Sequence, residues 1–242
     1  HTRWATHGVP NDVNAHPHRQ GRVTLVHNGI IENYRALRER LEREGYRFLT
    51  QTDTEIAAAL LDHHMKLHES PVAAIHAATA EMEGAYGFCM LLEGEPDTVY
   101  GIRRGSPLIA AKDETGSYVA SDVPAIIEYT RQYYLLEEEE VVVAHYGELR
   151  FYAPDGTPIE KKAKIANWSV EQAQKGGYPC FMQKEIHEQP RALADTIDGR
   201  TKDGFVTFEG DGLPDGFFRD VTKLYISACG TAMYSGMVGK AI

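Results

Sequence analysis

Short β-rich segments separated by turn residues dominate the middle of the chain, and they limit the folds open to it. Seven such runs are predicted over residues 85–92, 98–102, 108–111, 117–120, 132–136, 139–144 and 148–152. Turn-forming stretches such as Gly94-Glu95-Pro96-Asp97 interrupt them. Strands this short and numerous bury their apolar faces only when sheets pack against other layers, so we expect sheets packed together.

Two or three amphipathic helices precede these strands, following a predicted strand over residues 22–26. Glu39 and Arg43 are spaced as an i,i+4 ion pair, and Gly45 is a helix stop signal. A capping-box sequence at 52–55 opens the next helix, and Ser70-Pro71 opens another. The apolar positions of the three helices are Tyr34, Leu37 and Leu41; Ile56, Leu60 and Leu67; and Val72, Ile75, Thr79 and Met82. Helices outside packed sheets predict the α+β class.

The last third of the chain has a different organisation. Residues 167–177 are polar and end in glycine, which predicts a linker, and a helix is predicted over 181–195. Residues 224–228 form a short apolar run typical of a buried parallel strand. Cys229-Gly230-Thr231 and small residues follow, and strand, glycine turn and helix together present backbone N–H groups to a phosphate. We therefore expect the first βα unit of a second domain here.

Charge and cysteine content argue against several classes of protein. Acidic residues outnumber basic ones by 35 to 25, and the formal charge of −10 repels polyanions, so nucleic acid is not an expected partner. No apolar stretch approaches the roughly 20 residues that span a bilayer, and no membrane partner is expected. The three cysteines, Cys89, Cys180 and Cys229, are widely spaced, which argues against a disulfide framework and for a reducing, cytoplasmic compartment.

The first eight residues combine groups suited to binding. They include Arg3, Trp4, Thr6 and His7 and show no apolar stripe of either period, as expected of a binding loop. The Arg3 guanidinium can take a substrate carboxylate through a bidentate fork. The composition is equally compatible with a structural role for this segment, in which Arg3 pairs with a structural acid and Trp4 fills a gap in the core.

Asn28-Gly29 and Asp53 each have a structural and a functional interpretation. An Asn amide beside a glycine N–H is a donor pair of the kind that stabilises an oxyanion. Taken alone, however, Asn28-Gly29 favours a hairpin turn, because Asn-Gly is a common hairpin dipeptide. Asp53 lies in the capping box, where a carboxylate stabilises a helix terminus or, equally, holds the α-ammonium group of an amino acid.

Two further charged groups are interpreted as non-catalytic. His1, His7, His16, His18 and His27 are close in the sequence, but no Cys, Asp or Glu falls at a matching short spacing, so we predict no metal site. The acidic run 137–140 is most simply a solvated entry to a strand.

The order of the motifs resembles that of one enzyme family, the glutamine–fructose-6-phosphate aminotransferases (isomerizing). The resemblance covers the chain nearly end to end, and it is carried by His1-Thr2-Arg3-Trp4-Ala5-Thr6-His7-Gly8, Asn14-Ala15-His16-Pro17-His18, His27-Asn28-Gly29-Ile30-Ile31-Glu32-Asn33, Thr52-Asp53-Thr54-Glu55, Gly84-Ala85-Tyr86-Gly87, Arg104-Gly105-Ser106-Pro107-Leu108, Ala120-Ser121-Asp122, Met182-Gln183-Lys184-Glu185-Ile186-His187-Glu188-Gln189-Pro190 and Ala228-Cys229-Gly230-Thr231.

The resemblance implies an α+β fold in two parts. Residues 1–166 would form a type 2 glutamine amidotransferase domain of the N-terminal-nucleophile kind, an αββα sandwich. Residues 167–180 would be a linker, and residues 181–242 would begin an α/β sugar-isomerase (SIS) domain.

The implied activity converts fructose 6-phosphate and glutamine to glucosamine 6-phosphate and glutamate, a step of hexosamine biosynthesis. The implied full-length enzyme is a homodimer that needs no metal or organic cofactor. Arg3 would hold the glutamine carboxylate and Asp53 its amino group, while Asn28 and the Gly29 N–H would form the oxyanion hole. The remaining implied site residues are Trp4, Thr6 and His7 in a loop that closes over glutamine, and Cys229, Gly230 and Thr231 at the start of a sugar-phosphate loop.

The chain departs from the family pattern in two respects. The family's nucleophile is a cysteine at the mature N-terminus, whereas this chain begins with His1 and stops inside an apparent helix, so we expect that both ends are cut. Ala232 stands where relatives often have a serine, which removes one hydroxyl contact to phosphate. The alternatives are another glutamine amidotransferase and a non-catalytic sugar-phosphate-binding protein. The first would lack the Cys229-Gly230-Thr231 unit, and the second would have lost its glutamine-binding residues.

A purified protein consisting of these 242 residues is predicted to hydrolyse no glutamine and to make no glucosamine 6-phosphate. None of its three cysteines occupies the position of the family's nucleophile, because Cys89 falls within a predicted strand and the other two fall after residue 166. Release of glutamate from glutamine by the purified chain is the measurement, and clear turnover contradicts the prediction.

Overall fold

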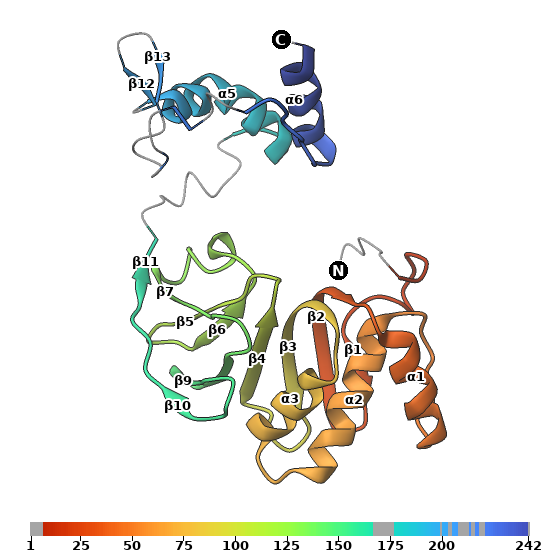
Figure 1. Ribbon diagram of the computed structural model, residues 1–242. Helices are drawn as coiled ribbons and strands as arrows, with labels where there is room; N and C mark the ends of the chain where they lie inside the picture. Colours follow the sequence, from red (N-terminus) through yellow and green to blue (C-terminus); the bar gives the residue numbers. More distant parts are fainter. Residues whose placement is uncertain are drawn as a thin grey trace. The chain divides into compact units, whose positions relative to one another are not determined.

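The computed structural model describes residues 7–166, 177–198, 200–202, 205–207, 213, 216–217 and 221–241. The chain divides into two units, His1–Gln174 and Lys175–Ile242 (Figure 1). In the first unit, helices and two packed sheets confirm the predicted α+β class.

A seven-stranded antiparallel sheet is the centre of the first unit. Its order is β1-β2-β3-β4-β8-β9-β10. The strands are β1 (His18–Gln20), β2 (Val23–Ile31), β3 (Gly84–Leu92), β4 (Thr98–Arg104), β8 (Val141–His145), β9 (Glu148–Tyr152) and β10 (Pro158–Ile159). Side chains alternate between its two faces, so that Val141 packs on the helical side and Val142 toward the second sheet.

The second sheet has four strands in the order β11-β7-β5-β6. They are β5 (Ile109–Lys112), β6 (Ser117–Ala120), β7 (Gln132–Leu135) and β11 (Lys164–Ile165). Apolar side chains from both sheets meet in a buried cluster of Leu108, Ala110, Leu136, Val142 and Phe151. The 3-10 helix η1 (Val123–Ala125) and the turn after it cover the outer face of this sheet. The seven predicted strands are all present, with ends shifted by two residues at most.

Three helices cover the other face of the larger sheet (Figure 1). They are α1 (Tyr34–Arg43), α2 (Asp53–Leu67) and α3 (Pro71–Ala80). The predicted apolar positions are buried, or partly buried in the case of Tyr34, with one error: Leu67 is 64% exposed because it ends α2 beyond the sheet contact. The predicted Glu39–Arg43 pair is also wrong, because the Arg43 guanidinium instead donates to the Glu39 carbonyl, 3.2 Å away.

The capping box that opens α2 is only half formed. The Thr52 hydroxyl accepts a hydrogen bond from the Glu55 N–H at 3.3 Å, as predicted. The Glu55 carboxylate does not return to the Thr52 N–H. It accepts instead from the N–H groups of Leu49 and Thr50, so that it fixes the preceding loop.

Strand β2 continues through Asn28-Gly29, so the hairpin turn favoured by the dipeptide is wrong. Asn28 is paired with Gly87 of β3, and Gly29 with Tyr86. The local Asn-Gly signal carries no information about β3, which pairs with β2 along its whole length and overrides it.

The acidic run 137–140 leads into β8 but is only partly solvated: Glu137 and Glu138 are exposed, as predicted, whereas Glu139 and Glu140 are not. Glu139 accepts hydrogen bonds from Arg104 and from the Tyr86 hydroxyl. Glu140 is only 8% exposed and pairs with Lys161. These carboxylates are anchored because cations of neighbouring segments reach them, so the run braces the loop after β4.

The described residues of the second unit form two helices and a small hairpin. They are α5 (Phe181–Ile197), which confirms the predicted helix, α6 (Gly230–Ala241), and the hairpin of β12 (Thr201–Lys202) and β13 (Phe205–Val206). Residues 224–228 are extended but form no strand, because no described strand pairs with them. Of the predicted linker, residues 167–176 lie outside the described part of the chain.

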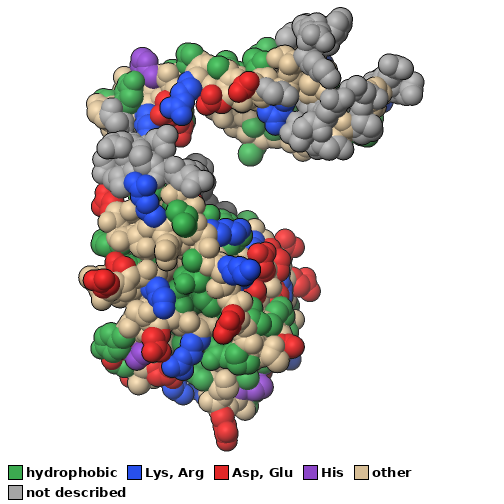
Figure 2. All heavy atoms as spheres, turned by 90° about the vertical axis from the view of Figure 1, so that its left-hand side faces the viewer, with side chains coloured by type: hydrophobic (Ala, Val, Ile, Leu, Met, Phe, Trp, Pro, Cys, Tyr) green, Lys and Arg blue, Asp and Glu red, His purple; other side chains and the backbone are tan. Residues whose placement is uncertain are grey.

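Among the described residues, no helix is both long enough and apolar enough to cross a bilayer. Figure 2 shows basic and acidic side chains interspersed on one face of the molecule.

A substitution at Gly29 tests whether the close approach of β2 and β3 requires a glycine. Its φ is +138°, and a Cβ built on it lies 2.1 Å from the Ala85 carbonyl oxygen. Gly29→Ala is therefore expected to lower the free energy of unfolding by about 2 kcal/mol or more. Gly94→Ala is the control, because its φ is +94° and no atom lies within 4 Å. Urea unfolding of both variants measures the difference, and equal losses would contradict the predicted clash.

Candidate functional site

The structure places four of the predicted glutamine-site residues in the first unit and describes their surroundings. They are His7, Asn28, Gly29 and Asp53. The other three, Arg3, Trp4 and Thr6, lie outside the described residues.

Asp53 is a buried carboxylate at the first residue of α2. It is 4% exposed, and its Oδ2 accepts a hydrogen bond from the Ile31 N–H at 2.8 Å. Its Oδ1 faces His7 Nδ1 at 4.0 Å. One oxygen is thus held by β2, and the other is directed toward His7.

Imidazole rings surround the first turn of α2. His27 Nδ1 and His16 Nε2 each lie 3.0 Å from the Thr54 hydroxyl oxygen. His18 Nε2 lies 3.2 Å from the Thr52 hydroxyl. The rings of His16 and His27 are stacked at 6.4 Å. The sequence indicated that these histidines cluster, but not that the hydroxyl groups of α2 join them.

His27 is held neutral by its surroundings. Burial lowers the pKa of its imidazole, and the nearby Asp53 carboxylate, 4.0 Å from Nδ1, opposes that effect only in part. The ring also packs edge-on against Phe88, with 4.9 Å between centroids.

Asn28 leaves the opposite face of β2 from His27. His27 is buried against the helices, whereas Asn28 is exposed, as alternation along a strand requires. Next to it, a Cβ at Gly87 would lie 3.3 Å from the Pro107 carbonyl oxygen and 3.6 Å from Ser106 Cβ. The loop after β4 therefore lies close over the strand pair beside Asn28.

Cys89 is not an activated thiol. Burial raises the pKa of the Cys89 thiol to about 12, so it stays protonated at neutral pH. Cys180 precedes α5, and Cys229 precedes α6.

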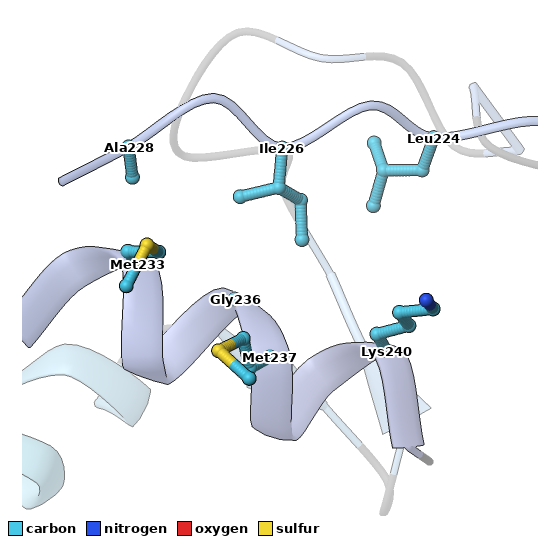
Figure 3. Close-up of a pocket in the computed structure, with 7 residues that line it drawn as sticks. All are labelled: Leu224, Ile226, Ala228, Met233, Gly236, Met237 and Lys240. Carbon is cyan, nitrogen blue, oxygen red and sulfur yellow. The ribbon is translucent and has the colours of Figure 1, made fainter.

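In the second unit, Cys229, Gly230 and Thr231 lie where α6 begins. Gly230 is the first helical residue and has a φ of +60°. Leu224, Ile226 and Ala228 point toward α6 at every second residue, and with Met233 and Met237 they line an open groove (Figure 3). A Cβ at Gly236 would lie 2.8 Å from Ile226 Cγ2, so this glycine permits the close approach. The turn and the helix thus form as predicted, but the preceding segment packs on α6 without a strand ladder.

No group of three or more His, Cys, Asp or Glu side chains in the described part of the chain is arranged to hold a metal ion. The sequence did not identify Thr54 as a site residue. Its position directly after Asp53, among buried neighbours on α2, is the signal that could have indicated it.

Residues 1–128 match the family described as "Glutamine amidotransferase domain". The chain belongs to this family of glutamine amidotransferases. In fold it is similar to the glutamine phosphoribosylpyrophosphate amidotransferase from B. subtilis, with a TM-score of 0.52 and 24% identity over 64% of this chain and 34% of that one. The predicted N-terminal-nucleophile glutaminase fold is therefore confirmed for the first unit.

Curated relatives with the same name match almost the whole chain. "Glutamine--fructose-6-phosphate aminotransferase [isomerizing]" of Clostridium perfringens is 42% identical over 243 residues, which is 99% of this chain and 40% of the relative. The protein of that name from Aquifex aeolicus is 40% identical, over 99% of this chain and 39% of its own length. The chain thus spans about 40% of the length of these relatives.

Acid is expected to destabilise the first unit through His27. Because burial lowers the pKa of His27 in the folded chain, the unfolded chain binds a proton first as the pH falls below about 6.5. The free energy of unfolding should therefore fall between pH 7.5 and 5.5, by at most about 1.4 kcal/mol per pH unit from this group. Urea unfolding across this range measures the slope. His27→Gln should make it shallower, and an unchanged slope contradicts the assignment.

Proposed function

We propose that the first unit is the glutaminase part of a glutamine–fructose-6-phosphate aminotransferase (isomerizing). In this proposal Asp53 holds the α-ammonium group of glutamine, and Arg3 holds its carboxylate. The Asn28 amide and the Gly29 N–H stabilise the oxyanion formed when a thiolate attacks the side-chain amide. Trp4, Thr6 and His7 cover the bound glutamine.

The observation that carries the proposal is the Asp53 carboxylate. One oxygen is fixed by the Ile31 N–H, three residues after Asn28, and the other faces His7 at 4.0 Å. A carboxylate that serves only as a helix cap accepts from backbone N–H groups of its own helix, whereas this one is buried, accepts from a strand and faces His7. A bound ammonium group would complete its partners.

The acceptor half of the proposed reaction is supported by sequence similarity. Relatives named for fructose 6-phosphate match the chain through its second unit. We place Cys229, Gly230 and Thr231 at a sugar-phosphate loop, because backbone N–H groups at the start of α6 suit a phosphate. Ammonia released from glutamine would add to fructose 6-phosphate in a SIS domain that begins at residue 181. We propose a cytoplasmic, homodimeric full-length enzyme.

Two substitutions in the full-length protein separate the proposed roles. Asp53→Asn should raise KM for glutamine by about 10- to 100-fold, because it removes a charge-assisted hydrogen bond but keeps an acceptor for Ile31. Asn28→Ala should instead lower kcat of glutamine hydrolysis by about 100- to 1000-fold.

Asp62→Asn is the matched control. Asp62 is also a buried carboxylate of α2, and it accepts from the Arg22 N–H and the Tyr46 hydroxyl, away from the proposed site. Its substitution should leave KM for glutamine within about twofold of the unmodified enzyme. If Asp53→Asn and Asp62→Asn had the same KM, Asp53 would not be the ammonium site.

A further inference from the structure

Thr54 is buried between two imidazoles and has none of the usual roles of a helix threonine. It is 2% exposed and belongs to the first turn of α2, where Thr52 already provides the side-chain cap. Its hydroxyl oxygen lies 3.0 Å from His27 Nδ1 and 3.0 Å from His16 Nε2. It therefore joins α2 to β2 and to the segment before β1.

A single hydroxyl proton couples the protonation of the two rings. A neutral imidazole donates from one nitrogen and accepts at the other. The Thr54 hydroxyl can donate to only one of the two nitrogens, so the other ring must donate to its oxygen. When both rings are neutral and the hydroxyl donates to one of them, the facing nitrogen of that ring is unprotonated and the facing nitrogen of the other ring carries a proton. Burial lowers the pKa of His27, which keeps that ring in the neutral state on which this coupling depends.

The same hydroxyl contributes one of two cross-links between the strand and the helix of the site. Thr54 bonds His27, the residue before Asn28, and Asp53 bonds the N–H of Ile31, the second residue after Gly29. The two links lie on either side of Asn28-Gly29 along β2. Together they set where the proposed oxyanion donors lie relative to the Asp53 carboxylate.

We propose that Thr54 is a positioning residue of the glutamine site. Its hydroxyl fixes the tautomers of His16 and His27 and holds the first turn of α2 against the strand that carries Asn28 and Gly29. Thr54 contacts neither glutamine nor the reacting atoms. The catalytic consequence rests on the proposed glutaminase function, whereas the tautomer coupling does not.

Thr54→Val, Thr54→Ser and a matched control test the proposal in the full-length enzyme. Valine keeps the shape and removes the hydroxyl, so kcat/KM for glutamine should fall about tenfold or more, as misplaced catalytic groups lose rate. Serine keeps the hydroxyl and should restore kcat/KM to within about twofold. Thr98→Val removes a different threonine–histidine contact, between Thr98 Oγ1 and His145 Nδ1 at 3.1 Å, and should leave kcat/KM unchanged.

Nitrogen-15 NMR of the histidine rings gives a readout that does not need glutamine turnover. The unmodified protein should show one protonated and one unprotonated nitrogen among His27 Nδ1 and His16 Nε2. Thr54→Val should change this pattern, and Thr98→Val should not. If the unmodified enzyme lacks glutaminase activity, the proposed function fails while the ring nitrogens still test the coupling.

Three results would overturn the inference. One is a Thr54→Val enzyme with unchanged kcat/KM and an unchanged tautomer pattern. Another is an unmodified protein whose two rings are neutral and in which His27 Nδ1 and His16 Nε2 are both protonated or both unprotonated. This measurement does not depend on whether the valine variant folds. The third is a Thr54→Ser enzyme as impaired as the valine variant.

Discussion

The buried first turn of α2 holds together the elements that carry the candidate site. Burying polar side chains is unfavourable unless each finds a partner, and here the partners come from different segments of the chain. Asp53 bonds β2, Thr54 bonds His16 and His27, and Glu55 bonds the loop before the helix. The helix start is therefore a junction, and its polar contacts orient the strand as much as they stabilise the helix.

The same turn explains how the described histidines are held together. Nitrogens of His16, His18 and His27 lie within hydrogen-bond distance of the hydroxyl groups of Thr52 and Thr54. A ring that is buried and neutral can exchange a hydrogen bond with a hydroxyl at little cost in desolvation. The cluster is accordingly a hydrogen-bonded support for β2.

Regular elements of the first unit could be predicted from the sequence because their signals are local. Alternation and turn residues located the seven strands, and apolar spacing located the helices. Errors arose where a distant partner decides the outcome. Leu67 lies beyond the sheet, residues 224–228 have no described strand to pair with, and the acidic run 137–140 meets cations of other segments. In the candidate site, Asp53 could be identified because it belongs to a sequence motif. Thr54 could not, because its contacts with His16 and His27 are formed only in the folded chain.

Asn28-Gly29 illustrates how the fold changes the weight of a motif. As a dipeptide it favours a turn, and a turn would explain both residues without any function. Within β2 that explanation no longer applies, because the strand continues to Ile31 in register with β3. Glycine is still required there, since its φ is +138° and the Ala85 carbonyl leaves no room for a Cβ. A strand interior gains nothing in stability from such a residue. The fold thus removes the turn as the explanation of Asn28-Gly29, and the oxyanion role of the pair stays a prediction.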